Sequence, residues 1–125
     1  MTIQQLEKIY DEVNGFSEKR ARVKLGDKEG HVDLDGKITT PIIYDYVGNF
    51  QEMRAYVGLN DKEGHVDLDG KITTPIIYDD VRNFYNGDAV VELNEEHGYV
   101  DLHGNLFPEY RNCFIEAVFK WLKKN

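Results

Sequence analysis

Three copies of a short polar pattern contain the residues whose types and spacing could carry chemistry. The copies are Glu29-His31-Asp33, Glu63-His65-Asp67 and the diverged His97-Tyr99-Asp101. Alternate residues of a β-strand share one face, and neighbours across strands lie about 5 Å apart, so two such stripes could offer histidine and carboxylate ligands to a divalent metal. Because the third copy breaks the pattern and no cysteine takes part, we favour a solvated polar face. A metal-dependent hydrolase is the alternative.

Other catalytic and metal-binding signatures are weaker. Asp33–Gly36 has the spacing of the middle of a calcium loop, but His31 and Ile42 stand where the first acidic ligand and the bidentate glutamate belong. The Asp-Gly pair is better explained as a turn. The chain has no glycine-rich phosphate loop and no nucleophile elbow, and its one cysteine, Cys113, falls on an apolar stripe. We therefore expect a protein that is not an enzyme and that needs no cofactor or metal.

The elements that position these residues belong to a tandem repeat of 34 residues. Residues 27–45 read DKEGHVDLDGKITTPIIYD, and residues 61–79 read the same 19 letters. Identity over this length exceeds what packing requires, so we infer a recent duplication, natural or engineered. A third, diverged copy continues the period. We divide the single domain, 1–125, into an N-terminal segment 1–8, repeats 9–42, 43–76 and 77–110, and a closing helix 108–124.

Within one repeat the apolar pattern has a period of two, which predicts an all-β fold of antiparallel β-meanders. The strands predicted in the first repeat are 21–25, 28–34 and 37–40. Ala21, Val23 and Leu25 alternate with polar residues, and Val32 shares one face with Leu34. Three stacked meanders can supply the stability that a single repeat of this size lacks.

Turns and breakers delimit these strands. Gly26-Asp27 offers a tight turn, and Asp35-Gly36 predicts a two-residue hairpin of type I′, which needs positive φ at both central positions. Pro41 cannot donate to a strand ladder and should end the third strand. The Tyr-Asp-x-Val-x-x-Phe linker that follows is expected to be irregular. Its Tyr, Val and Phe should fill the core between repeats.

The two ends of the chain depart from the β pattern. After Pro108 the apolar residues follow helical spacing, which predicts an amphipathic helix. These residues are Tyr110, Cys113, Phe114, Ala117, Val118, Trp121 and Leu122. We favour a cap over the last repeat, with a helix that docks a partner or dimerises as the alternative. At the other end, Thr2 and Gln5 have the spacing of a capping box for a short helix.

The repeat resembles that of the WG-repeat family of β-repeat proteins. The resemblance rests on the tract from Phe16 through ARVKLGDKEGHVDLDGKI to Tyr44-Asp45, and it covers roughly residues 9–110. The tryptophan that names the family would precede three repeated glycines, where this chain has Glu29, Glu63 and His97. An aromatic stripe has thus become an acidic one. The resemblance implies an interaction or scaffold module and transfers no single activity.

Charge indicates which partners the chain suits. Its 15 Lys and Arg against 23 Asp and Glu give a net charge of −8, which argues against nucleic acid and anionic lipid and for a basic protein surface. No apolar run approaches about 18 residues, and the N-terminus lacks a secretory pattern. The single cysteine agrees with a reducing compartment. We expect a cytoplasmic protein without a membrane span, monomeric or weakly self-associating.

The third repeat carries a charge feature that exceeds this background. Between Asn83 and Tyr110 six residues are acidic and none is Lys or Arg, whereas the first two repeats mix both signs. Val90 is an apolar residue among these acids, as in an interface core with a polar rim. The predicted partner-binding residues are Asp88, Val90, Glu92, Glu95, Glu96 and Asp101. A solvated acidic face is the alternative interpretation.

These features together predict a non-catalytic protein-binding module. In its most specific form it is a small acidic inhibitor, an immunity protein or antitoxin that neutralises a basic nuclease toxin by charge complementarity. A structural scaffold repeat whose partner is not basic is the alternative.

Overall fold

A computed structural model describes residues 1–107 of the chain, so the predicted helix 108–124 and Cys113 lie outside the described residues. These 107 residues form one short helix and three antiparallel sheets of four strands each. The helix is α1 (Ile3–Leu6). The first sheet contains β1 (Glu12–Ser17), β2 (Arg20–Leu25), β3 (Lys28–Val32) and β4 (Ile38–Tyr44). The second contains β5 (Tyr46–Val47), β6 (Ala55–Leu59), β7 (Lys62–Val66) and β8 (Ile72–Tyr78), and the third β9 (Asp80–Val81), β10 (Asp88–Leu93), β11 (Glu96–Asp101) and β12 (Leu106–Phe107).

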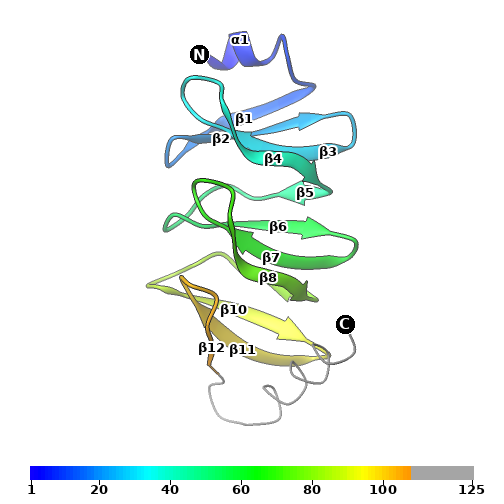
Figure 1. Cartoon of the computed structure of the whole chain (residues 1–125), viewed down its shortest axis with the longest axis vertical. Coiled ribbons are helices and arrows are strands. Elements are labelled where there is room, and N and C mark those ends of the chain that lie inside the picture. Colours follow the sequence, from blue (N-terminus) through cyan, green and yellow to red (C-terminus); the bar gives the residue numbers. More distant parts are fainter. Residues whose placement is uncertain (108–125) are drawn as a thin grey trace.

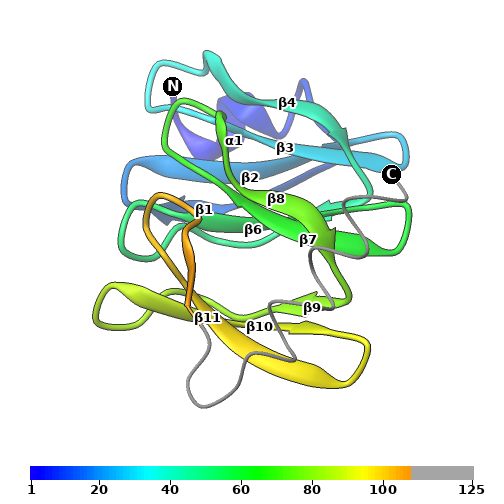
Figure 2. The ribbon, with the colours of Figure 1, turned by 60° about the horizontal axis from the view of Figure 1, so that its bottom comes forward.

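The three sheets are stacked along the long axis of the molecule (Figure 1). Each sheet is one repeat, and its strands are neighbours in chain order, which is a meander. The first and third sheets lie at opposite ends with the second between them, so the repeats form an open stack and not a closed ring (Figures 1 and 2). This confirms the predicted all-β fold of three tandem meanders. Among residues 1–107 no helix has the length and apolar character needed to cross a bilayer.

The meander has four strands where the sequence predicted three. The extra strand comes from the linker that was expected to be irregular: β5 pairs with β6 through Val47 and Val57, and β9 pairs with β10 through Val81 and Val91. Pairing satisfies the backbone groups that burial of the linker valine removes from water. The linker side chains Tyr44, Val47 and Phe50 are buried, which confirms that they fill the core.

In the first two repeats the fourth strand runs through its proline instead of ending there. In the first repeat, β4 extends across Pro41 because it is an edge strand, where a missing N–H costs no ladder bond. The pairing of β3 with β4 shifts register between Glu29 and His31, so β4 bulges toward Gly30. A Cβ on Gly30 would lie 2.5 Å from the Thr40 carbonyl oxygen and 2.8 Å from that of Pro41. This close approach is why the position must be glycine.

The two kinds of hairpin turn differ. Asn60 and Asp61 both have positive φ, 54° and 66°, as a two-residue type I′ turn requires. The prediction of the same turn at Asp35-Gly36 is wrong, because only Gly36 has positive φ, 83°. The Asp33 carboxylate accepts hydrogen bonds from the N–H groups of Asp35 and Lys37, both at 2.9 Å, and this starts a wider three-residue loop. The loop carries Leu34 to the surface, against the prediction that it shares the face of Val32.

Each sheet has its own small apolar core, and α1 closes the first. The first core contains Leu6, Ala21, Val23 and Val32, whereas Leu25, at the end of its strand, is exposed. Thr2 accepts from the N–H of Gln5, and the Gln5 side chain accepts from the N–H of Thr2, which confirms the predicted capping box. The Met1 ammonium donates to the Leu34 carbonyl oxygen and so ties this end to the first hairpin loop.

The close approach at Gly30 predicts the effect of a methyl group there. Gly30→Ala should lower the free energy of unfolding by about 1–3 kcal/mol, because backbone oxygens must move to admit the Cβ. Gly15→Ala is the matched control, since a Cβ at Gly15 meets nothing within 4 Å, and it should change stability by less than about 0.5 kcal/mol. Urea unfolding of both variants measures the difference. Equal effects would show that the bulge yields to the side chain.

Candidate interaction surface

In the first two repeats, the histidines and glutamates of the polar stripe join one repeat to the next. His31 and His65 are only 1% and 0% exposed, so the prediction of a solvated stripe is wrong for both histidines. The His31 Nε2–H donates to the Gly48 carbonyl oxygen in the next repeat at 2.7 Å, and Nδ1 accepts from the Thr40 hydroxyl at 2.8 Å. The ring packs against Phe50 of the next repeat, with 4.6 Å between ring centroids. The face of the strand that looked polar is therefore the face on which the next repeat stacks.

His65 repeats this arrangement one repeat further along. Its ring bonds to the Arg82 carbonyl oxygen at 2.8 Å and to the Thr74 hydroxyl at 2.9 Å, and it packs against Phe84. Burial lowers the pKa of both histidines to about 4, although the hydrogen bonds to Gly48 and Arg82 act in the opposite direction. Both rings are neutral at pH 7, with both nitrogens engaged. Within residues 1–107 no group of three or more His, Cys, Asp or Glu side chains is placed to hold a metal.

Carboxylates of the first two repeats also bind the backbone of the next repeat. Glu29, which stands where the family tryptophan would be, accepts from the Val47 N–H at 2.9 Å, and Glu63 accepts from the Val81 N–H at 2.8 Å. At the other end of the first sheet, Glu18 accepts from the N–H groups of Glu52 and Met53, which lie in a turn of the second repeat. Each of these hydrogen bonds joins one sheet to the next. Much of the acidity of the first two repeats is therefore structural.

An arginine also forms a hydrogen bond from one repeat to the next. The Arg20 Nε–H donates to the Leu68 carbonyl oxygen at 3.0 Å, and Arg54 does the same to Leu102 at 2.9 Å. The third repeat has Asp88 at this position. Its Cα partner across the β10–β11 ladder is Asp101, so two acidic residues stand directly opposite one another.

The predicted partner-binding residues fall mostly on one face of the third sheet. Ala89, Val91 and Leu93 are buried, so the alternation turns Asp88, Val90 and Glu92 to the other face, as predicted. Asp101 lies opposite Asp88, and Glu92 makes a 2.9 Å ion pair with His97 when that histidine is protonated. Glu95 is exposed in the hairpin turn. Glu96 is half-buried opposite Leu93 and does not join the face of Asp88.

The sequence reasoning missed the aromatic residues beside these acids. Tyr99 is the Cα partner of Val90 on one side and of Phe107 on the other. The rings of Tyr99 and Phe107 stack with centroids 6.0 Å apart and planes 16° apart, and Phe107 is 40% exposed. The available signal was the exchange of the repeated histidine for Tyr99. An apolar row of Val90, Tyr99 and Phe107 thus runs between acidic residues.

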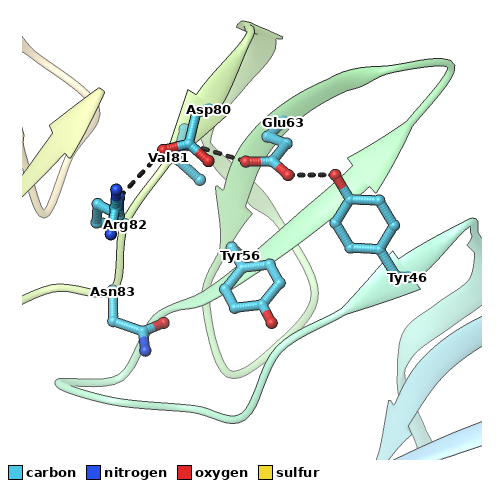
Figure 3. Close-up of a pocket in the computed structure, with 7 residues that line it drawn as sticks. All are labelled: Tyr46, Tyr56, Glu63, Asp80, Val81, Arg82 and Asn83. Atoms are coloured by element: carbon cyan, nitrogen blue, oxygen red, sulfur yellow. Dashed lines mark hydrogen bonds and ion pairs between the residues drawn. The ribbon is translucent and has the colours of Figure 1, made fainter. Parts of the chain in front are cut away.

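A concave site elsewhere in the structure was also missed. It lies where the second and third repeats meet and encloses about 330 Å³ (Figure 3). Its lining residues are Tyr46, Tyr56, Glu63, Asp80, Val81, Arg82 and Asn83. The signal in the sequence was the pair of tyrosines that replace charged residues of the first repeat, Glu12 and Arg22.

These features define a stacked β-meander protein whose repeats are joined by buried polar side chains. The model of the WG containing repeat matches residues 6–28, 30–62 and 64–96, and the chain belongs to this family. No curated protein and no solved structure matches the chain significantly. The family match indicates a repeat-type interaction module, of a kind that is generally not catalytic.

The buried histidines predict a loss of stability in mild acid. A histidine with a folded-state pKa of about 4 stabilises the fold fully above the unfolded value of 6.5, and this contribution is lost as pH falls through that window. Lowering the pH from 7 to 5 should cost about 2 kcal/mol for each buried histidine. His65→Gln should halve this pH dependence, whatever its effect at pH 7.

The matched control is His103→Gln, because the His103 side chain is exposed. This variant should keep the pH dependence of the unmodified chain. Chemical unfolding between pH 7 and pH 5 measures all three proteins. Identical slopes for His65→Gln and the unmodified protein would contradict the account.

Proposed function

We propose that this protein is a non-catalytic protein-binding module whose acidic third repeat docks a basic partner. The observation that carries the proposal is the exchange of a repeated arginine, Arg20 and Arg54, for Asp88. In the first repeat the Arg20 charge lies close enough to Asp33 to help lower the pKa of that carboxyl, after the larger effect of the Lys37 N–H. In the third repeat the corresponding Asp101 has Asp88 opposite it.

Like charges directly opposite on neighbouring strands destabilise a sheet. The Asp101 carboxylate accepts hydrogen bonds from the N–H groups of His103 and Asn105, and an arginine at position 88 would add an opposite charge across the ladder from it. A lysine or arginine of a partner, placed between the two carboxylates, supplies the missing positive charge. The half-buried Val90 and Tyr99 and the exposed Phe107 give the same face an apolar centre, and acids flank it on both sides. Interfaces commonly have such a centre and a polar rim.

The specific form of the proposal is a small inhibitor of the immunity or antitoxin type, acting on a basic nuclease. Charge complementarity speeds association and occludes an active site without chemistry by the inhibitor. Its support is the net charge of −8. The cytoplasmic location expected from the sequence stays a prediction.

The structure supports the two alternative functions to different degrees. A scaffold repeat with a non-basic partner fits the family equally well. The salt dependence of partner binding distinguishes it from a module that docks a basic partner. A metal-dependent hydrolase built on the Glu-His-Asp stripes is not supported, because His31 and His65 are buried with both ring nitrogens bonded.

Asp88→Arg tests the proposal by restoring the residue that the other repeats have. The variant should be as stable as the unmodified protein or up to about 1 kcal/mol more stable, since the opposite-charge pair with Asp101 replaces a like-charge pair. Binding to a basic partner, isolated by affinity capture, should weaken about 10–100-fold, mainly through slower association. Surface plasmon resonance at several salt concentrations measures the association rate, which should fall as salt rises.

Asp27→Arg is the matched control, since it makes the same change of charge at an exposed turn residue of the first repeat. It should alter the association rate by less than about two-fold, because screened charges at a distance contribute little. If both variants bind as the unmodified protein does, or if binding ignores salt, the acidic face does not dock a basic partner.

A further inference from the structure

The groove between the second and third repeats is built by two tyrosines that lie on glycines. A Cβ on Gly58 would overlap the Tyr46 ring, and a Cβ on Gly48 would overlap the Tyr56 ring. The ring centroids are 6.2 Å apart, with the planes tilted by 59°. Tyr46 points to Glu63, which comes from the next strand but one, and Asp80–Asn83 form the opposite wall (Figure 3). The volume of about 330 Å³ is at the lower end of the range for small-ligand pockets.

Comparison of the first two repeats indicates that the tyrosines and glycines of the groove were exchanged together. The core positions of the segments 12–26 and 46–60 are the same in both copies: Val13 and Val47, Phe16 and Phe50, Ala21 and Ala55, and Val23 and Val57. The four positions of the tyrosines and their glycines differ, whereas Glu63 corresponds to the identical Glu29. Glu12, Asn14, Arg22 and Lys24 of the first repeat correspond to Tyr46, Gly48, Tyr56 and Gly58 of the second. Each tyrosine has changed together with the glycine beneath it, which packing of the core does not require.

The third repeat does not have this arrangement either. Its residues at the same positions are Asp80, Arg82, Val90 and Glu92. The first repeat has instead a 3.8 Å ion pair between Lys24 and Glu12. Within the described residues, the paired tyrosines on glycines therefore belong to the junction of the second and third repeats alone.

The charges around the groove favour a cation. One Glu63 oxygen accepts from the Val81 N–H at 2.8 Å, and the other accepts from the Tyr46 hydroxyl. An ionised carboxylate has about four acceptor sites, so each oxygen can accept once more. Burial first, and then the hydrogen bond to Glu63, raise the pKa of Tyr46, so its hydroxyl stays protonated and donates to Glu63. The positive side chain of Arg82 is 75% exposed, and its Nε–H pairs with Asp80 at 3.1 Å.

We propose that this groove binds an organic cation, a guanidinium or alkylammonium group seated against Tyr46 and Tyr56 and bonded to Glu63. Aromatic faces attract cations within about 6 Å of the ring centroid, and both rings border the same cavity. The group can be the side chain of a partner protein or a small free cation. The site is separate from the acidic row of the third repeat and does not depend on that row docking a protein.

Titration with ethylguanidinium, followed by the ring signals of Tyr46 and Tyr56 in NMR spectra at constant ionic strength, tests the site. We expect saturable shifts of both rings, and no such shifts with the neutral analogue N-ethylurea. Tyr46→Leu and Glu63→Gln should each weaken binding at least five-fold, whereas Tyr46→Phe, which keeps the ring, should weaken it less than two-fold. The amide of Glu63→Gln can still accept from the Val81 N–H, so this variant should stay folded.

Tyr85→Leu is the control for loss of a tyrosine elsewhere, since Tyr85 is 77% exposed and lies outside the groove; it should bind as the unmodified chain does. Asp88→Arg should also leave ethylguanidinium binding unchanged, which separates this site from the acidic face. Tighter binding of the tripeptide Gly-Arg-Gly than of ethylguanidinium would identify a protein side chain as the occupant, and the reverse a free cation. Equal binding of N-ethylurea, or full binding by Glu63→Gln and Tyr46→Leu, overturns the proposal.

Discussion

A neutral histidine buried between stacked sheets is the interaction on which the rest of this structure depends. Both faces of a sheet in the middle of the stack are involved in packing. One face packs on the apolar core of its own repeat, and the other packs on the next repeat. The second side carries polar backbone groups of the linker, which must be paired once water is removed. His31 and His65 pair with the Gly48 and Arg82 carbonyl oxygens and present apolar ring faces to Phe50 and Phe84. Each repeat therefore contacts its neighbour through one repeated set of bonds, as in other linear repeat proteins.

The same requirement explains why the two ends of the described stack differ from its middle. In the first repeat the Met1 ammonium donates to the Leu34 carbonyl oxygen, whereas Arg20 and Arg54 donate to the corresponding oxygens of Leu68 and Leu102. In the third repeat the joint residues are exchanged: Tyr99 replaces the histidine and Asp88 the arginine. Within residues 1–107 these two positions therefore differ in chemistry from their counterparts in the first two repeats. The proposed docking face includes them, and the tyrosine groove uses corresponding positions one repeat earlier.

How far the sequence predicts this structure depends on what each pattern measures. The 34-residue period and the alternation of Ala21 and Val23 report burial against one core, and they correctly predict stacked meanders. Alternation also assumes that the second face of a strand is wet, and for His31 that assumption fails because the next repeat covers it. The prediction that Pro41 ends its strand was wrong because β4 is an edge strand. Proline disrupts the ladder of a central strand but is tolerated on an edge strand. The groove needed a comparison of the copies with each other, since Tyr46 and Gly58 become neighbours only across paired strands.

The central claim is that His31 and His65 are neutral joints between repeats, each with Nε2–H donating to a carbonyl oxygen of the next repeat. The most direct test is an NMR titration of the histidine ring carbons and nitrogens, with assignments from His31→Gln and His65→Gln. The account predicts that both rings hold the Nε2–H tautomer at pH 7 and stay neutral down to about pH 5, with pKa values of about 4. Titration of either ring near 6.5, as for a histidine in water, would contradict the burial of the joint and with it the stacking of the repeats.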